Sequence, residues 1–186
     1  MKKSSLIALC LSFLLLAKPA IAQYNGISIP TQSLTPSPNL AVKIIDYNLP
    51  YPGILPGNPI YSLKVIRDKI IELMTTDPTQ RSVFYLLQAD KRLAASLLLF
   101  DSGNAELGEQ TLSKSQNYLE MSLEEAIKAR KMQNMDEIIA KIKVSCQKQS
   151  EEIKAILSKE RGETAEKLKE DLKRVEMLEN RAEDLD

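Results

Sequence analysis

Leu49-Pro-Tyr-Pro-Gly-Ile-Leu-Pro-Gly-Asn-Pro-Ile-Tyr-Ser-Leu-Lys64 is the stretch of sequence that fixes where the folded part begins. It holds four prolines and two glycines, residues that restrict or release the backbone angles, and it runs directly into a helical pattern. In a segment of this kind, most of the residues serve to set the direction of the backbone. We therefore expect an extended, proline-rich arm that docks on the helices that follow it.

The pattern after Pro59 is helical. Ile60, Leu63, Ile66, Ile70 and Leu73 form one stripe, which predicts an amphipathic helix over residues 59–75. Asparagine followed by proline is a typical helix start, because asparagine caps the helix and proline suits its first position. Asn58 and Pro59 therefore mark the start of this helix.

Capping signals divide the rest of the chain into further helices. Asp77-Pro78 with Gln80 predicts a second helix that ends near 102, where Gly103 can take the left-handed conformation. Further helices are predicted over about 104–131, from Asn134, and after Gly162. No stretch of useful length alternates between apolar and polar residues as a strand would. The fold class is therefore all-α: a helical bundle over 49–131, preceded by the arm and followed by a C-terminal helical hairpin or coiled-coil extension over 132–186.

The N-terminus has the pattern of a secretory signal peptide. A basic start and the apolar run 6–17 precede Ala20-Ile21-Ala22, which predicts cleavage after Ala22. The apolar run is too short to span a membrane, and a retained anchor is the alternative. Residues 23–48 are low in charge and predict a flexible linker. We expect a secreted or cell-envelope protein that meets the membrane only during export.

Composition excludes several classes of function. The chain has 25 basic and 25 acidic residues, and removal of residues 1–22 takes away three lysines and no acid. The mildly acidic remainder does not favour nucleic acid as a partner. Histidine is absent, which removes the usual nucleophile–histidine pairs and the commonest zinc ligand. We predict no cofactor and no metal.

Asp90 is the one carboxylate on the apolar stripe of the second helix. A buried charge there must be paired or hydrogen-bonded. Its candidate partners are Arg67, Lys64 and the backbone N–H groups of the turns at 53–57. We interpret Asp90 as a polar anchor that docks the arm near 51–56. A solvated position at the edge of the stripe and a catalytic acid are the alternatives.

Cys146 is the one cysteine that remains after signal cleavage. It occupies a core position in the seven-residue pattern of the last two helices, where a thiol acts as a small hydrophobic group. An intermolecular disulfide across the seam of a homodimer formed by 134–185 is the alternative, because an unpaired cysteine in an exported protein favours one.

Several motifs follow one another in order along the chain: Pro52-Gly-x-Leu-Pro56, Pro59-x-Tyr-x-Leu-Lys64, Thr76-Asp77-Pro78 and Ala89-Asp-Lys-Arg-Leu93. Together they resemble the bacterial domain-of-unknown-function family 5667, over about residues 48–128. The resemblance implies an exported helical domain without an assigned activity, and it supplies no catalytic residues.

The predicted function is a non-enzymatic, protein-interaction or structural role in the bacterial cell envelope. Its partner would be another envelope protein or a second copy of the chain. Tyr47, Tyr51 and Tyr61 surround the arm, where tyrosines pack over a helix or line a groove. The alternative is a carboxylate-dependent hydrolase that acts on a cell-wall polymer. The structural or binding candidates are Pro52, Gly53, Leu55, Pro56, Pro59, Tyr61, Lys64, Arg67, Asp90 and Arg92.

Overall fold

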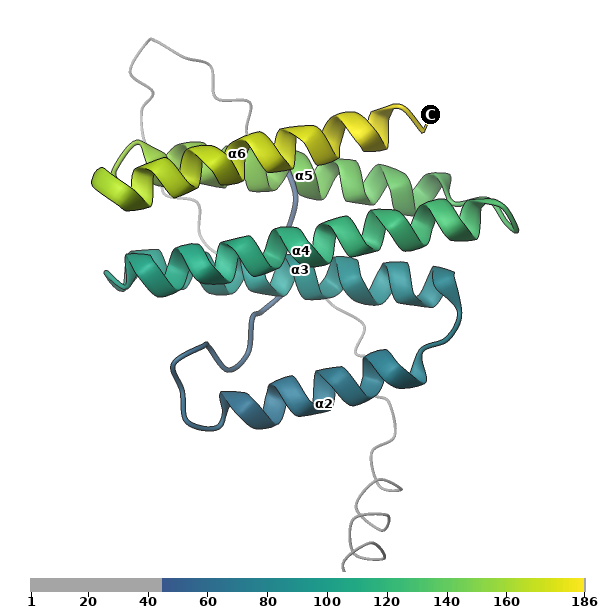
Figure 1. Ribbon diagram of the computed structural model, residues 1–186, viewed down its shortest axis with the longest axis horizontal. Coiled ribbons are helices and arrows are strands. Elements are labelled where there is room, and N and C mark those ends of the chain that lie inside the picture. Colours follow the sequence, from purple (N-terminus) through teal and green to yellow (C-terminus); the bar gives the residue numbers. More distant parts are fainter. Residues whose placement is uncertain (1–44, 186) are drawn as a thin grey trace, which may run out of the picture. The chain divides into compact units, whose positions relative to one another are not determined.

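The computed structural model describes residues 45–185, which form five α-helices and no strand (Figure 1). All of these residues belong to one compact unit. The prediction of an all-α fold is confirmed. The predicted signal peptide, and the linker up to residue 44, lie outside the described residues. The helices are α2 (Tyr61–Met74), α3 (Pro78–Asp101), α4 (Ala105–Arg130), α5 (Asp136–Leu157) and α6 (Gly162–Glu183).

Short-range capping sets the helix ends close to where the sequence predicts them. The Asp77 side chain accepts a 2.9 Å hydrogen bond from the Gln80 N–H and caps α3. Gly103 ends this helix with a φ of 79°, and the Asn104 side chain caps α4. Helix α2 begins at Tyr61 rather than Pro59, because the Asn58 side chain accepts the Ile60 N–H within a turn.

Helices α3 and α4 are antiparallel and lie very close together. Small residues recur every seven positions along both contact faces, and these are Ser82, Ala89 and Ser96 on α3 and Gly108, Ser115 and Ser122 on α4. Ser82 and Ser122 each donate a hydrogen bond to the other's carbonyl oxygen, at 2.9 and 2.8 Å. Ser115 donates to the Ala89 carbonyl oxygen at 2.7 Å. Small side chains permit this spacing, because the size of the residues in contact sets the distance between helix axes.

One apolar core joins α3, α4, α5 and α6. Its largest fully buried apolar side chains come from all four helices and include Leu93, Leu112, Leu119, Ile142, Ile153 and Leu168. The segments 49–131 and 132–186, which the sequence separates, therefore share one core. The predicted C-terminal hairpin is formed by α5 and α6. Their apolar stripes face the interior of the bundle within a single chain.

Polar contacts also join α4 to α6. The fully buried Gln116 amide donates a 3.0 Å hydrogen bond to the backbone carbonyl oxygen of Asp171. Nearer the surface, Glu120 pairs with Arg174 at 2.8 Å and with Arg181 at 3.3 Å.

Helix α2 lies along the α3–α4 pair, on the side away from α5 and α6 (Figure 1). No helix within residues 45–185 is long and apolar enough to cross a membrane.

Candidate interaction surface

Helix α2 packs on the bundle with its polar side. Asp68 is the one buried residue of this helix. The buried Tyr85 of α3 donates a 3.1 Å hydrogen bond from its hydroxyl to the Glu72 carboxylate. Tyr61 is half-buried on the same side, and burial raises its pKa. Helix α2 is therefore attached by polar and aromatic contacts, and it adds no residue to the apolar core.

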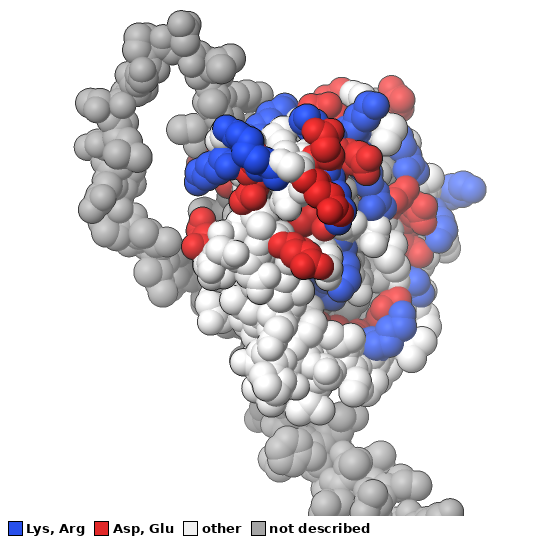
Figure 2. All heavy atoms as spheres, turned by 60° about the vertical axis from the view of Figure 1, so that its left-hand side comes forward, with Lys and Arg blue, Asp and Glu red and all other residues white. Residues whose placement is uncertain are grey.

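The apolar side of α2 faces solvent. The five most exposed apolar side chains of α2 are between 50% and 73% exposed, and we call them the α2 apolar face: Leu63, Ile66, Ile70, Leu73 and Met74. The lower part of Figure 2, at the height of α2 in Figure 1, carries few charged side chains. The sequence predicted the stripe, and the structure shows that the stripe points away from the bundle.

Two cations border the α2 apolar face. Arg67 pairs with Asp68 at 2.7 Å, and Lys69 pairs with Glu72 at 3.0 Å. Both cationic side chains are 63% exposed, whereas the side chains of Asp68 and Glu72 are only 8% and 13% exposed. The carboxylates thus face the bundle and the cations face solvent. The charged groups that a partner would meet at the border of the face are therefore the two cations.

The arm before α2 is attached at three points along its length. The Ile45 N–H donates a 3.0 Å hydrogen bond to the Glu151 carboxylate of α5. Tyr47 contacts α3, where its hydroxyl donates to the Asp90 carboxylate at 2.5 Å. Farther on, the Lys64 ammonium donates to the carbonyl oxygens of Pro52 and Ile54, at 2.6 and 3.2 Å. The arm therefore runs from α5 across α3 to α2.

Asp90 is a buried anchor of this arm, with partners that the sequence did not indicate. It is 5% exposed, and it accepts hydrogen bonds from Tyr47 and from the Ser145 hydroxyl of α5, the latter at 2.7 Å. Burial raises the pKa of Asp90, and the two hydrogen bonds act in the opposite direction. The expected partners lie elsewhere: Lys64 bonds the arm backbone and Arg67 bonds Asp68. The segment that docks on Asp90 is accordingly at residue 47 and not at 51–56.

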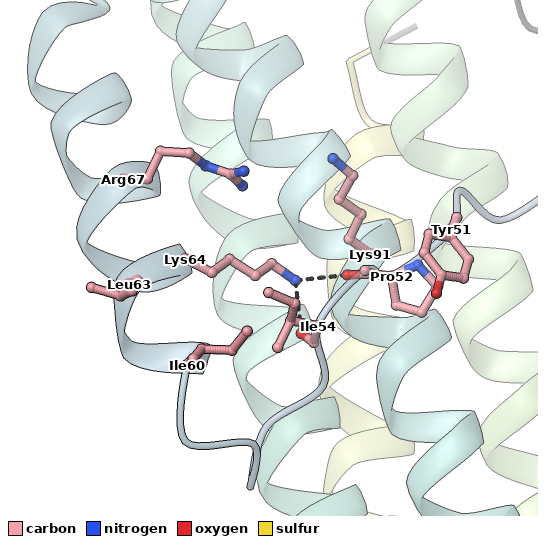
Figure 3. A pocket seen from close by; sticks show the side chains of 9 residues that line it. Tyr51, Pro52, Ile54, Ile60, Leu63, Lys64, Arg67 and Lys91 are labelled. Atoms are coloured by element: carbon pink, nitrogen blue, oxygen red, sulfur yellow. Dashed lines mark hydrogen bonds between the residues drawn. The ribbon is translucent and has the colours of Figure 1, made fainter. Parts of the chain in front are cut away.

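A pocket of about 520 Å³ lies between the arm and α2. Figure 3 shows Lys64, Arg67 and Lys91 extending toward it from α2 and α3, beside the arm at Pro52 and Ile54. The other residues that line it are Tyr51, Gly53, Ile60 and Leu63. Three of the residues that line the pocket are cations, the others are uncharged, and none is acidic. Burial lowers the pKa of Lys64, which the arm carbonyl oxygens hold in place.

The structure brings together only part of the predicted set of site residues. Pro52, Gly53, Lys64 and Arg67 line the pocket. Leu55, Pro56 and Pro59 belong to the turn before α2, and Asp90 lies under the arm at Tyr47. Arg92 stacks over the Tyr118 ring at 4.0 Å and bonds the Gln88 side chain. Tyr61 faces the bundle, with the Lys64 ammonium over its ring.

Sequence reasoning missed Lys91, Ile54 and Ser145 as parts of these contacts. Lys91 lies next to Asp90 in the sequence, and this adjacency could have placed it beside the arm. No local signal indicates Ser145, because it reaches Asp90 across 55 residues of sequence.

Cys146 is completely buried in the core shared by the four helices. Burial raises the pKa of its thiol to about 12. The folded chain therefore does not present this thiol to a second copy, and an intermolecular disulfide would require the bundle to open. The packing fits the interpretation of Cys146 as a small hydrophobic side chain.

Asp171 of α6 is another buried acid. Burial raises its pKa to about 7, the charge of Glu109 on α4 adds to this rise, and Arg174 opposes it. It lies on a different helix from every residue of the pocket. Within residues 45–185, no three acidic or cysteine side chains are grouped to hold a metal ion.

A comparison with protein-family models identifies the family of this chain. The family model described as domain of unknown function (DUF5667) matches residues 53–184, well over half of the chain. The chain belongs to the DUF5667 family. The DUF5667 match covers all five described helices, and it continues past residue 128, where the resemblance shown by the sequence motifs ends. No curated protein and no solved structure matches the chain.

Proposed function

We propose that this protein is a non-enzymatic interaction module of the bacterial cell envelope, and that the α2 apolar face is its binding surface. The observation that carries the proposal is the orientation of α2. Its polar side, with Asp68 and Glu72, is turned toward the bundle, while its apolar side is exposed.

This orientation differs from that of an ordinary surface helix. A helix that serves only the fold turns its apolar stripe toward the core, because burial of apolar area stabilises the folded state. In α2 the side chains of the stripe instead face solvent, and each of the five that form the α2 apolar face is at least half exposed. Contiguous exposed apolar patches of this kind mark sites of protein–protein contact.

A hydrolase acting through carboxylates receives less support. The pocket beside α2 is lined by three cations and by no acid. Asp90 lies under the arm and already accepts hydrogen bonds from Tyr47 and Ser145. Hydrolysis of a glycosidic bond needs two carboxyl groups that flank the bond. The export of the module is proposed from the N-terminal pattern of residues 1–22.

Site-specific photocrosslinking in the producing cells tests this proposal. A benzophenone amino acid is placed at Ile66 or Ile70 of the α2 apolar face, and in a matched control at Met177 of α6, which is 57% exposed. We expect irradiation to give a covalent adduct with a defined protein, identified by mass spectrometry, at the α2 positions only. The same adducts at Met177, or none at any position, would contradict the proposal.

A further inference from the structure

We propose that the partner of the α2 apolar face is an amphipathic helix with acidic residues along both edges of its own apolar stripe. This inference rests on the proposed function, because it specifies what the same surface binds. It follows from the spacing of the apolar residues, from the charges at their border and from the shape of the adjoining pocket.

The spacing of the face suits a helical partner. Leu63, Ile66, Ile70 and Leu73 follow one another at intervals of three, four and three residues. This is the pattern with which one helix receives the side chains of another in a coiled-coil seam. Amphipathic helices bind such surfaces through anchors at the same spacings.

The charges at the border specify the edges of that partner. Arg67 and Lys69 occupy the two positions that flank the apolar seam, one on each side. Their carboxylate partners, Asp68 and Glu72, are turned inward and largely buried. Complementary charges across an interface favour the correct partner, and like charges disfavour a wrong one. The edges of the bound helix should therefore be acidic.

A second copy of this chain fits the surface less well. In a two-fold symmetric dimer each surface meets an identical surface. The exposed border of the α2 apolar face is cationic on both sides, so a second copy brings no opposite charge to Arg67 and Lys69. Pairing of two such faces would bury the apolar stripe without charge complementarity.

An anionic bilayer also fits less well. The pocket beside the face, with its volume of about 520 Å³, can admit a projecting side chain, whereas a lipid surface would leave it unfilled. Lys64, Arg67 and Lys91 at this pocket favour an acidic side chain.

Two synthetic helical peptides test the inference. Both are about three heptads long with leucine at the seam positions; one carries glutamate and the other lysine at every flanking position. Like charges on each peptide oppose its self-association. Fluorescence anisotropy measures their binding to the full exported protein at low and high salt. We expect the glutamate peptide to bind at least about tenfold more tightly at low salt, and this preference to shrink at high salt.

Charge reversal in the protein supplies the decisive comparison. Arg67→Glu with Lys69→Glu should invert the preference, so that the lysine peptide binds more tightly. The control is Lys167→Glu with Lys169→Glu on α6, two exposed lysines that also pair with neighbouring glutamates. This control should retain the preference for the glutamate peptide. Circular dichroism checks folding, and the milder pair Arg67→Gln with Lys69→Gln should abolish the preference if the reversal variant unfolds.

The remaining outcomes separate this inference from the proposed function. Equal binding of both peptides, or a preference unchanged in the reversal variant, would overturn the inference. An identified crosslinked protein together with no peptide binding would leave the proposed function standing and overturn the inference alone. Binding to phosphatidylglycerol vesicles but to neither peptide would assign the face to a membrane surface. Dimerisation that Ile66→Ser with Ile70→Ser abolishes, without peptide binding, would assign it to a second copy.

Discussion

The Tyr47 hydroxyl lies 2.5 Å from a carboxylate oxygen of Asp90, and this hydrogen bond joins the extended arm to the most apolar helix of the bundle. Asp90 is also bound by Ser145, so one buried carboxylate connects the arm, α3 and α5. A buried acceptor that loses a partner costs free energy, because water cannot replace the lost hydrogen bond. The pair therefore holds the arm in place.

Tyr47→Phe should destabilise the protein by about 1–2 kcal/mol, because it removes one of the two hydrogen bonds of a buried carboxylate. Urea denaturation measures this loss, and hydrogen exchange should show faster exchange of the amides at 45–47. Tyr51→Phe is the matched control, since Tyr51 is 79% exposed. Equal stability of the two variants would show that the arm does not depend on Asp90.

Ile66→Ser combined with Ile70→Ser should change the free energy of unfolding by no more than about 0.5 kcal/mol per site, because both side chains already face solvent. Ile142→Ser in the core should instead cost more than about 3 kcal/mol, because it leaves a cavity and buries a hydroxyl. Urea denaturation compares the variants. A large loss of unfolding free energy in the double variant would show that the α2 apolar face contributes to the stability of the fold.

Cys146 should not react with a thiol reagent such as dithionitrobenzoate until the protein is denatured. Its side chain is completely buried, and burial raises the pKa of the thiol to about 12, so little thiolate forms. The protein should also migrate identically on reducing and non-reducing gels. Rapid reaction under native conditions, or a dimer band that disappears on reduction, would support the intermolecular disulfide.

Asp171→Asn should stabilise the protein at pH 8 and have little effect near pH 4. Burial raises the pKa of Asp171 to about 7, above the value of about 3.9 in an unfolded chain. The folded state therefore favours the protonated acid, and the stability that this provides is present below pH 4 and lost as the pH rises through 7. Asparagine remains neutral at every pH. We expect a gain of about 2 kcal/mol at pH 8, reduced from the full shift by solvent screening.

The pH dependence of this gain is the decisive readout. Free energies of unfolding are compared at pH 4, 6 and 8 for both proteins. Glu170→Gln, at the neighbouring position, is the control for the removal of a charge near Asp171. A gain that stays constant with pH would mean that titration of Asp171 is not its cause.

Gly108→Ala should destabilise the α3–α4 pair by about 1 kcal/mol, although alanine is the better helix former. A Cβ atom at this position would lie 3.0 Å from the Phe100 ring, so the ring would have to shift within the packed α3–α4 contact. In a Phe100→Ala background the ring is gone, and the same change should stabilise by about 0.5–1 kcal/mol. A double-mutant cycle measures the difference. If Gly108→Ala changes the stability in the same direction in both backgrounds, contact with the Phe100 ring is not the cause.

The helix ends could be predicted from the sequence because they depend on local contacts. Asp77 caps α3 through an atom three residues away, and Gly103 adopts a conformation that glycine favours by itself. The close contact of α3 with α4 was also encoded, in small residues at seven-residue spacing such as Ser82 and Ala89. The stripes of large apolar residues, which predict the helices, do not reveal this contact.

The orientation of α2 could not be predicted in the same way. A periodic stripe shows that a helix has two sides, but not which side meets the bundle. Contacts distant in sequence decide this, since Tyr85 binds Glu72 and the arm backbone fixes Lys64. The partners of Asp90 are equally distant, because Tyr47 and Ser145 lie 43 and 55 residues away. The burial of Asp90 followed from its stripe, whereas the identity of its partners did not.

The hydrogen bond from Gln116 to the Asp171 carbonyl oxygen determines more than the attachment of α6. Leucine and isoleucine contacts have no preferred direction, so apolar stripes alone tolerate a rotation of α6 about its own axis. Such a rotation would carry the Asp171 carbonyl oxygen away from the Gln116 amide and leave a buried donor unsatisfied. One glutamine in the interior thus fixes which side of α6 faces α4.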